Sequence, residues 1–200
     1  MKNILIATSN QGKIKEFREL FKSFRDIKLF SLTDFKRVEE PEEIGKTFEE
    51  NSLQKAKYYA EKLKISAVAD DSGLSINALD GFPGIYSGRF NNGEKKDFSF
   101  AFNAINLLLK YKDIEDHSAS FFCCISYYDF DKKSSNSFLG ETKGKLRFPP
   151  KGDNGFGYDP IFVPEGYDKS FAEFSMEEKN SMSHRAKALG KFVAWFRENG

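Results

Sequence analysis

Short apolar runs alternate with stretches of helical periodicity in the N-terminal part of the chain, and this alternation constrains the fold most strongly. The run "NILIAT" (3–8) is rich in β-formers and predicts a buried strand. From Ile14 onward, apolar residues recur at helical spacing, at Phe17, Phe21 and Phe24. The segment "IKLFSL" (27–32) predicts a second strand. A strand–helix–strand opening of this kind is typical of an α/β protein.

The rest of the chain continues the alternation but adds long strands. Thr47 and Glu50 have the spacing of a capping box and predict a helix start. Further elements are expected as helices over 48–63, 97–111 and 182–196, and as strands over 66–70, 117–130, 135–148 and 160–163. The two longest strands predict an antiparallel ribbon, so the sheet should be mixed. With 200 residues and no repeat or linker, we expect one domain over 1–200.

Composition excludes several classes of partner. Lys+Arg total 31 and Asp+Glu 30, which leaves a net charge of +1, whereas nucleic-acid-binding domains normally show a clearly basic face. No apolar stretch approaches the roughly 20 residues that span a membrane, and the N-terminal run is too short for a secretion signal. Cys123 and Cys124 are adjacent, so on a strand they point to opposite faces as buried fillers. We therefore expect a soluble, cytoplasmic protein that binds neither nucleic acid nor membrane.

A polar segment, "TSNQGK" (8–13), joins the first predicted strand to the first helix. Asn10 or Ser9 would cap that helix, Gly12 permits close backbone approach and Lys13 adds a charge. Free N–H groups at a helix start favour an anion such as phosphate. The segment lacks the GKS or GKT ending of a P-loop, so an ordinary capped turn is the alternative.

Two adjacent aspartates, Asp70 and Asp71, follow the apolar run that predicts the strand over 66–70. Neighbouring carboxylates repel, and burial raises the pKa of such groups. Either the pair faces water at a turn or a cation lies beside it. Mg²⁺ binds oxygen ligands and needs only one or two carboxylates beside water and phosphate. Asp71 with Glu42 or Glu43 therefore predicts a magnesium site, with a solvated acidic turn as the alternative.

Two C-terminal segments have the composition of a pocket for a planar base. In "GFGYDP" (155–160), Phe156 or Tyr158 is suited to stack on a base. In "EKNSMSHRAKA" (178–188), Lys179, His184 and Arg185 offer donors, the last two at a predicted helix start, where cations are disfavoured. The alternatives are a tight turn before a strand and a structural histidine.

Six segments in this order resemble the inosine triphosphate pyrophosphatase (Ham1-like) family of non-canonical purine nucleoside triphosphate pyrophosphatases, almost from end to end. They are "ATSNQGKIKEF", "TFEENSLQKA", "ADDSGL", "GFPGIYSGRF", "GFGYDPIF" and "EEKNSMSHRAKAL". The resemblance implies an α/β fold with a mixed, partly antiparallel, elongated sheet flanked by helices. It further implies two lobes around a central substrate cleft, and a homodimer.

The resemblance also implies the role of each motif residue. Asp71 is the favoured proton acceptor, Asp70 its helper and Lys13 the cation that offsets developing charge; the reverse order of the two aspartates remains open. Glu43 and Asp71 would bind Mg²⁺, with Glu42 as the alternative to Glu43. Substrate would contact Thr8, Ser9, Asn10, Gln11, Gly12, Lys13, Lys55, Ser72, Arg89, Phe156, Gly157, Tyr158, Asp159, Lys179, His184 and Arg185.

The reaction expected from this resemblance is hydrolysis of ITP, dITP or XTP to the monophosphate and pyrophosphate, which removes deaminated purines from the nucleotide pool. Such an enzyme is a metal-dependent hydrolase of acid anhydrides. Two alternatives remain: a pyrophosphatase of related fold for other modified nucleotides, and a non-catalytic nucleotide sensor. A sensor would have no need of a water-activating carboxylate, which argues against it.

Overall fold

The computed structural model describes residues 2–22, 24–36, 38–91 and 97–200. Within these ranges the strands are β1 (Lys2–Ile6), β2 (Ile27–Ser31), β3 (Ser66–Ile76), β4 (Ser118–Asp129), β5 (Ser134–Leu146) and β6 (Phe162–Pro164). The helices are α1 (Gln11–Phe21), α2 (Phe48–Leu63), α3 (Ser99–Tyr111), α4 (Met176–Met182) and α5 (His184–Asn199). None of these helices is long and apolar enough to span a bilayer.

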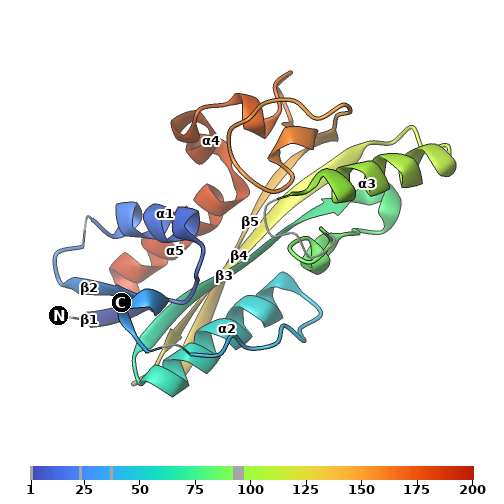
Figure 1. Cartoon of the computed structure of the whole chain (residues 1–200). Coiled ribbons are helices and arrows are strands. Elements are labelled where there is room, and N and C mark those ends of the chain that lie inside the picture. Colours follow the sequence, from blue (N-terminus) through green and yellow to red (C-terminus); the bar gives the residue numbers. More distant parts are fainter. Residues whose placement is uncertain (1, 23, 37, 92–96) are drawn as a thin grey trace. The chain divides into compact units, whose positions relative to one another are not determined.

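The strands form one sheet in the order β2-β1-β3-β4-β5-β6. Strand β1 pairs in parallel with both β2 and β3, whereas β5 and β6 pair antiparallel. The three long strands β3, β4 and β5 run side by side in Figure 1. The predicted mixed, partly antiparallel α/β architecture is confirmed.

The chain divides into two compact units, in line with the two lobes expected from the sequence. The first unit contains Met1–Asp71, Cys124–Leu139 and Ala188–Gly200; the second contains Ser72–Cys123 and Gly140–Lys187. Each unit is therefore built from segments that are far apart in the sequence. Strands β3, β4 and β5 each contribute residues to both units.

Small residues and aromatic rings build the core of the first unit. Ala56 and Ala60 of α2 are fully buried together with Ala67 and Ala69 of β3, which lets the helix pack closely on the sheet. Elsewhere in this unit, the ring of Phe21 from α1 lies 5.7 Å from that of Phe192 in α5. These contacts fix α1 and α2, whose first turns carry several of the predicted site residues.

Phenylalanine supplies much of the core of the second unit. Phe121, Phe162 and Phe171 are all buried, and their rings lie 4.6–5.9 Å apart, centroid to centroid. The high phenylalanine content of the chain, 22 residues, is thus partly explained by packing. The adjacent cysteines are also packing residues, since both are free thiols and both are buried, as the sequence predicted.

Candidate active site

The two aspartates lie within a strand, so the prediction that the strand ends at Asp70 is wrong. Strand β3 continues through Asp70 and Asp71 to Ile76, and both carboxyl side chains are buried. Successive strand residues point to opposite faces of a sheet, so each aspartate meets its own cation. Lys13 Nζ lies 2.8 Å from Asp70 Oδ2, and Lys55 Nζ lies 3.6 Å from Asp71 Oδ1. Two like charges are tolerated side by side because each is compensated separately.

The first turn of α1 places Lys13 next to Asp70. Asn10 is the N-cap, as predicted, and its Oδ1 accepts hydrogen bonds from Gly12 N (2.9 Å) and Lys13 N (3.2 Å). These two amides therefore bond the cap, and the anion site at the helix start stays a prediction. The exposed side chains of Ser9 and Gln11 remain available to a phosphate in this segment.

The first turns of α2 supply the partners of Asp71. Thr47 caps the helix by accepting a hydrogen bond from Glu50 N at 3.1 Å. The Glu50 carboxylate accepts from Lys46 N rather than from Thr47 N, so the predicted capping box is only half formed. Lys55 then lies where its ammonium contacts Glu43 Oε1 at 2.7 Å as well as Asp71. Lys55, predicted as a phosphate ligand, is thus the cation between two carboxylates.

Burial and neighbouring charge shift the ionisation of this cluster. Burial raises the pKa of Asp71 above its ordinary value, and the charges of Glu43 and Asp70 raise it further. Lys55 and a hydrogen bond from Asn51 act in the opposite direction without cancelling the shift. Burial alone would lower the pKa of Lys55, but Asp71, Glu43 and Asp70 together raise it. A carboxylate with a raised pKa is a better proton acceptor near neutral pH.

A separate cluster in the second unit contains the residues predicted to recognise a base. Lys179 Nζ donates to Asp159 Oδ2 at 2.5 Å, and the same oxygen accepts from Phe156 N at 2.7 Å. Gly155 has φ +78°, and a Cβ there would collide with the Asp159 carboxylate. The turn therefore requires glycine at position 155, because a side chain there would displace the Asp159 carboxylate that bonds Phe156 N and Lys179.

Phe156 is the aromatic ring that this cluster exposes. It is 46% exposed, with Lys179 Nζ 4.9 Å and Arg185 Cζ 5.6 Å from its ring centroid. Tyr158 is only 3% exposed and donates its hydroxyl to the carbonyl of Ser87 at 3.0 Å. Of the two aromatics left open by the sequence, Phe156 can stack on a ligand, while the Tyr158 ring belongs to the core.

His184 and Arg185 begin α5, as the sequence predicted, and both are buried. The imidazole of His184 stacks on Phe121, with ring centroids 4.7 Å apart and planes 13° apart. Arg185 Nη2 donates to Ser72 Oγ at 3.3 Å, which joins two predicted substrate residues. The guanidinium of Arg89 lies over the ring of Tyr86 and donates to the carbonyl of Ile85. Its contact with substrate stays a prediction.

Comparison with known proteins identifies the family. The Ham1 family model matches residues 4–195. The chain is 44% identical over 193 residues to a dITP/XTP pyrophosphatase of Bacillus anthracis, covering 96% of this chain and 94% of that protein. It is 41% identical to the dITP/XTP pyrophosphatase of Bacillus subtilis (strain 168), covering 96% and 95%. This chain belongs to the Ham1 family.

Solved structures of the Ham1 family share the fold of this chain over its whole length. A HAM1 protein from Coxiella burnetii superposes with a TM-score of 0.91 at 36% identity, covering 99% of this chain and all of that one. The Ham1 protein of Staphylococcus aureus superposes with a TM-score of 0.87 at 37% identity, with full coverage of both chains. The α/β architecture described above is therefore that of the Ham1 family.

The carboxylates of this Ham1-family protein fit a divalent cation. No three His, Cys, Asp or Glu side chains gather as a metal centre within the described ranges. Glu43 and Asp71 nevertheless already converge on one positive charge, the Lys55 ammonium. Mg²⁺ often takes only one or two protein carboxylates and completes its shell with water and phosphate oxygens. Of the two glutamates left open by the sequence, Glu43 is favoured because its carboxylate shares Lys55 with Asp71.

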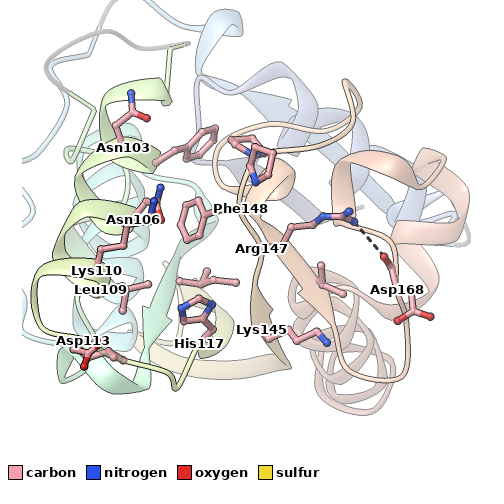
Figure 2. A pocket seen from close by; sticks show the side chains of 16 residues that line it. Asn103, Asn106, Leu109, Lys110, Asp113, His117, Lys145, Arg147, Phe148 and Asp168 are labelled. Atoms are coloured by element: carbon pink, nitrogen blue, oxygen red, sulfur yellow. Dashed lines mark hydrogen bonds between the residues drawn. The ribbon is translucent and has the colours of Figure 1, made fainter.

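A large cavity of the second unit contains none of the predicted site residues. It has a volume of about 910 Å³ and is lined by α3, the end of β5 and nearby loops. Figure 2 shows Asn106 and Lys110 on one side, Lys145 and Arg147 on the other, and His117 between them. Size alone does not identify the functional site of this Ham1-family protein; the two clusters with convergent charged groups do so better.

Sequence reasoning missed three residues that complete the clusters. Asn51 donates to Asp71, Gly45 donates its N–H to Asn51, and Phe121 supports His184. Asn51 precedes Lys55 by four residues and so shares its helix face. That spacing was the available signal for Asn51. Gly45 and Phe121 carried no signal, since their roles depend on contacts between segments far apart in the sequence.

Proposed function

We propose that this protein hydrolyses deaminated purine nucleoside triphosphates (ITP, dITP and XTP) to the monophosphate and pyrophosphate. The observation that carries the proposal is the cluster of buried Asp70 and Asp71 with partly buried Glu43, neutralised by Lys13 and Lys55. The names of the relatives as dITP/XTP pyrophosphatases support it. Three carboxylates and two ammonium groups suit a triphosphate carried with a divalent cation better than a neutral ligand.

Asp71 is assigned as the proton acceptor in this proposal. Water attacks the α-phosphorus, Asp71 takes the water proton, and the bond from the α-phosphorus to the oxygen that bridges to the β-phosphorus breaks. The electron pair leaves with pyrophosphate. The raised pKa of Asp71 favours the proton transfer, and general-base catalysis of this kind contributes about 10²–10⁴-fold. Asp70 fixes Lys13, whose charge offsets the negative charge that develops in the transition state.

We assign Glu43 and Asp71 as the ligands of Mg²⁺. A bound divalent cation supplies charge neutralisation of the phosphate oxygens and of the leaving group. Lys55 is assigned to hold the two carboxylates together and to contact a phosphate once its ion pairs are shared with the cation. Thr8, Ser9, Gln11 and Lys13 are assigned to the remaining phosphate contacts.

The second cluster is assigned to the purine base. Phe156 offers a half-exposed ring for stacking, and Lys179, His184 and Arg185 offer donors for a 6-keto oxygen. Adenine carries an amino group at that position, which would face a donor and leave buried groups unpaired. Sites that recognise a polar group in this way discriminate by about 10⁴-fold. Phe156 therefore accounts for stacking on the base, and the donors beside it support recognition of inosine and xanthosine over adenosine.

The first experiment assays purified protein on ITP, XTP, ATP and GTP, with and without Mg²⁺, measuring pyrophosphate separately from orthophosphate. We expect metal-dependent pyrophosphate release from ITP and XTP and none from ATP, whose 6-amino group would face a donor. GTP shares the 6-keto oxygen, so its rate shows whether the site also discriminates against the 2-amino group of guanine. Orthophosphate release would exclude attack at the α-phosphorus. Turnover of another modified nucleotide in place of ITP and XTP would favour a related pyrophosphatase, and binding without turnover would favour a nucleotide sensor.

We further propose a cytoplasmic homodimer. Both cysteines are free and buried, which suits a reducing compartment. Tyr86, in the segment "GFPGIYSGRF" (81–90), is 55% exposed and is therefore a candidate for the dimer interface. Sedimentation velocity of the wild type and of Tyr86→Glu tests the assembly: a dimer that the charge converts to monomer supports it, and a monomeric wild type contradicts it.

A further inference from the structure

Asn51 uses both ends of its side-chain amide inside the first unit. It lies in the first turns of α2 and is fully buried. Its Nδ2 donates to Asp71 Oδ2 at 3.1 Å, and its Oδ1 accepts from Gly45 N at 2.8 Å. One planar group thereby joins the carboxylate of β3 to the segment that carries Glu43.

The chemistry of the two partners fixes which way the amide points. Gly45 N–H can only donate and a carboxylate can only accept, so the oxygen must face Gly45 and the nitrogen must face Asp71. An aspartate at this position would set a second acceptor against Asp71, and an alkyl side chain would satisfy neither group. The site therefore requires a side chain that donates and accepts at adjacent atoms.

Gly45 packs directly on the helix that carries Asn51. A Cβ at Gly45 would lie 2.5 Å from Asn51 Oδ1, 2.8 Å from Glu50 Cβ and 2.9 Å from Asn51 N. A side chain there would force the segment away from α2. Because Gly45 has no Cβ, its backbone can lie against α2, and its hydrogen bond to Asn51 keeps it there. Glu43, two residues earlier, is thereby held near the helix.

Lys55 makes an ionic link between the same two segments, four residues further along α2. Its ammonium contacts Glu43 at 2.7 Å and Asp71 at 3.6 Å. This link is electrostatic, so a second cation that binds Glu43 and Asp71 would compete with Lys55 for the same carboxylate oxygens. The link through Asn51 carries no charge and does not compete with a cation.

We propose that Asn51 is a positioning residue that sets the spacing of Glu43 and Asp71 for the divalent cation. The inference rests on the proposed function for its catalytic meaning, although its effect on cation affinity is measured without nucleotide. Residues that orient metal ligands typically change metal affinity or activity by about 10–100-fold when they are replaced. Asn51 contacts Asp71, a proposed metal ligand, but it is not assigned a contact with substrate or with the reacting atoms.

The test compares Asn51→Leu, which keeps the approximate volume, and Asn51→Ala with the control Ser52→Ala. Ser52 is the next residue of α2 and equally buried, but it bonds Ser126 and the carbonyl of Glu49 instead of site residues. Mn²⁺ affinity of the nucleotide-free protein is measured by calorimetry, beside the melting temperature. We expect affinity about 10–100-fold weaker in both Asn51 variants and unchanged in Ser52→Ala, with a lower melting temperature in all three.

Steady-state kinetics on ITP complete the test. We expect the Mg²⁺ concentration for half-maximal rate to rise by about 10–100-fold in Asn51→Leu, with turnover partly restored at saturating Mg²⁺. Wild-type Mn²⁺ affinity in either soluble Asn51 variant would overturn the inference. If the wild type fails to cleave ITP while Asn51→Leu still loses Mn²⁺ affinity, the proposed function fails and the positioning role stands. If Asn51→Leu and Asn51→Ala both fail to fold where Ser52→Ala folds, Asn51 acts on the fold and the positioning role is rejected.

Discussion

The ammonium of Lys13 lies 2.8 Å from Asp70 Oδ2, and the Asp70 side chain is completely buried. A buried ion pair contributes little net stability, but removing one partner leaves a buried charge at a cost of about 3–5 kcal/mol. Lys13→Met should therefore lower the free energy of unfolding by about 3 kcal/mol. The double variant Lys13→Met/Asp70→Asn should recover much of that loss. Urea unfolding of both variants measures this, and equal stability of the two would contradict the pairing.

The elements with clear periodicity were predictable from the sequence, whereas the course of β3 was not. Asn10 was foreseen as a cap, and the helix predicted over 182–196 is present as α5, which begins at His184. The strand over 66–70 was predicted to stop where the apolar run ends and two charged residues begin. It continues to Ile76 because tertiary partners compensate Asp70 and Asp71, and propensity does not include such partners.

The candidate site was predictable to the level of residue type. Phe156 and Tyr158 have the same kind of side chain two positions apart, and only their burial separates a stacking ring from a core ring. Lys55 is one of many lysines in the sequence, and only the position of Glu43 shows that it bridges two carboxylates. The roles of these residues depend on contacts between segments far apart in the sequence, which the local sequence pattern does not contain.

Asp71→Asn should abolish turnover while largely keeping nucleotide binding. The amide can still accept a hydrogen bond from Asn51 but cannot take a proton from water. We expect kcat on ITP to fall by about 10²–10⁴-fold, with the dissociation constant for ITP, measured at saturating Mg²⁺, within a few-fold of the wild type. Stopped assays and calorimetry measure the two quantities. A larger loss of kcat in Asp70→Asn than in Asp71→Asn would transfer the role of base to Asp70.

Phe156→Ala should weaken nucleotide binding without harming the fold. The ring is half exposed, and loss of base stacking costs about 1–3 kcal/mol of binding free energy. Tyr158→Phe is the matched control, since it removes only the hydroxyl bond to Ser87 inside the core and should cost about 1 kcal/mol of stability. Calorimetric titration with a non-hydrolysable ITP analogue and thermal unfolding separate the effects. Unchanged affinity in Phe156→Ala would remove the ring from the base site.

The first unit should become less stable at acid pH as Asp129 takes up a proton. Burial works against its ionisation, but hydrogen bonds from Lys132 N, Lys2 Nζ and Asp131 N outweigh burial and hold the pKa below the ordinary 3.8. A carboxyl group with a lowered pKa in the folded state contributes stability that is complete above 3.8. That contribution is lost as the pH falls through the folded-state pKa.

Asp129→Asn should therefore be less stable than the wild type by about 2 kcal/mol at pH 7, since hydrogen bonds to a charged group contribute about 1.5–3 kcal/mol. The difference should shrink as the pH falls below about 4, where the wild-type carboxylate takes up a proton. Urea unfolding between pH 2.5 and 7, values chosen to bracket the ordinary pKa, measures the difference. The exposed neighbour Asp131, as Asp131→Asn, is the control and should show only a small difference in stability from the wild type at pH 7. A constant deficit in Asp129→Asn at every pH would mean that the side chain acts through its shape and neutral hydrogen bonds, not through its charge.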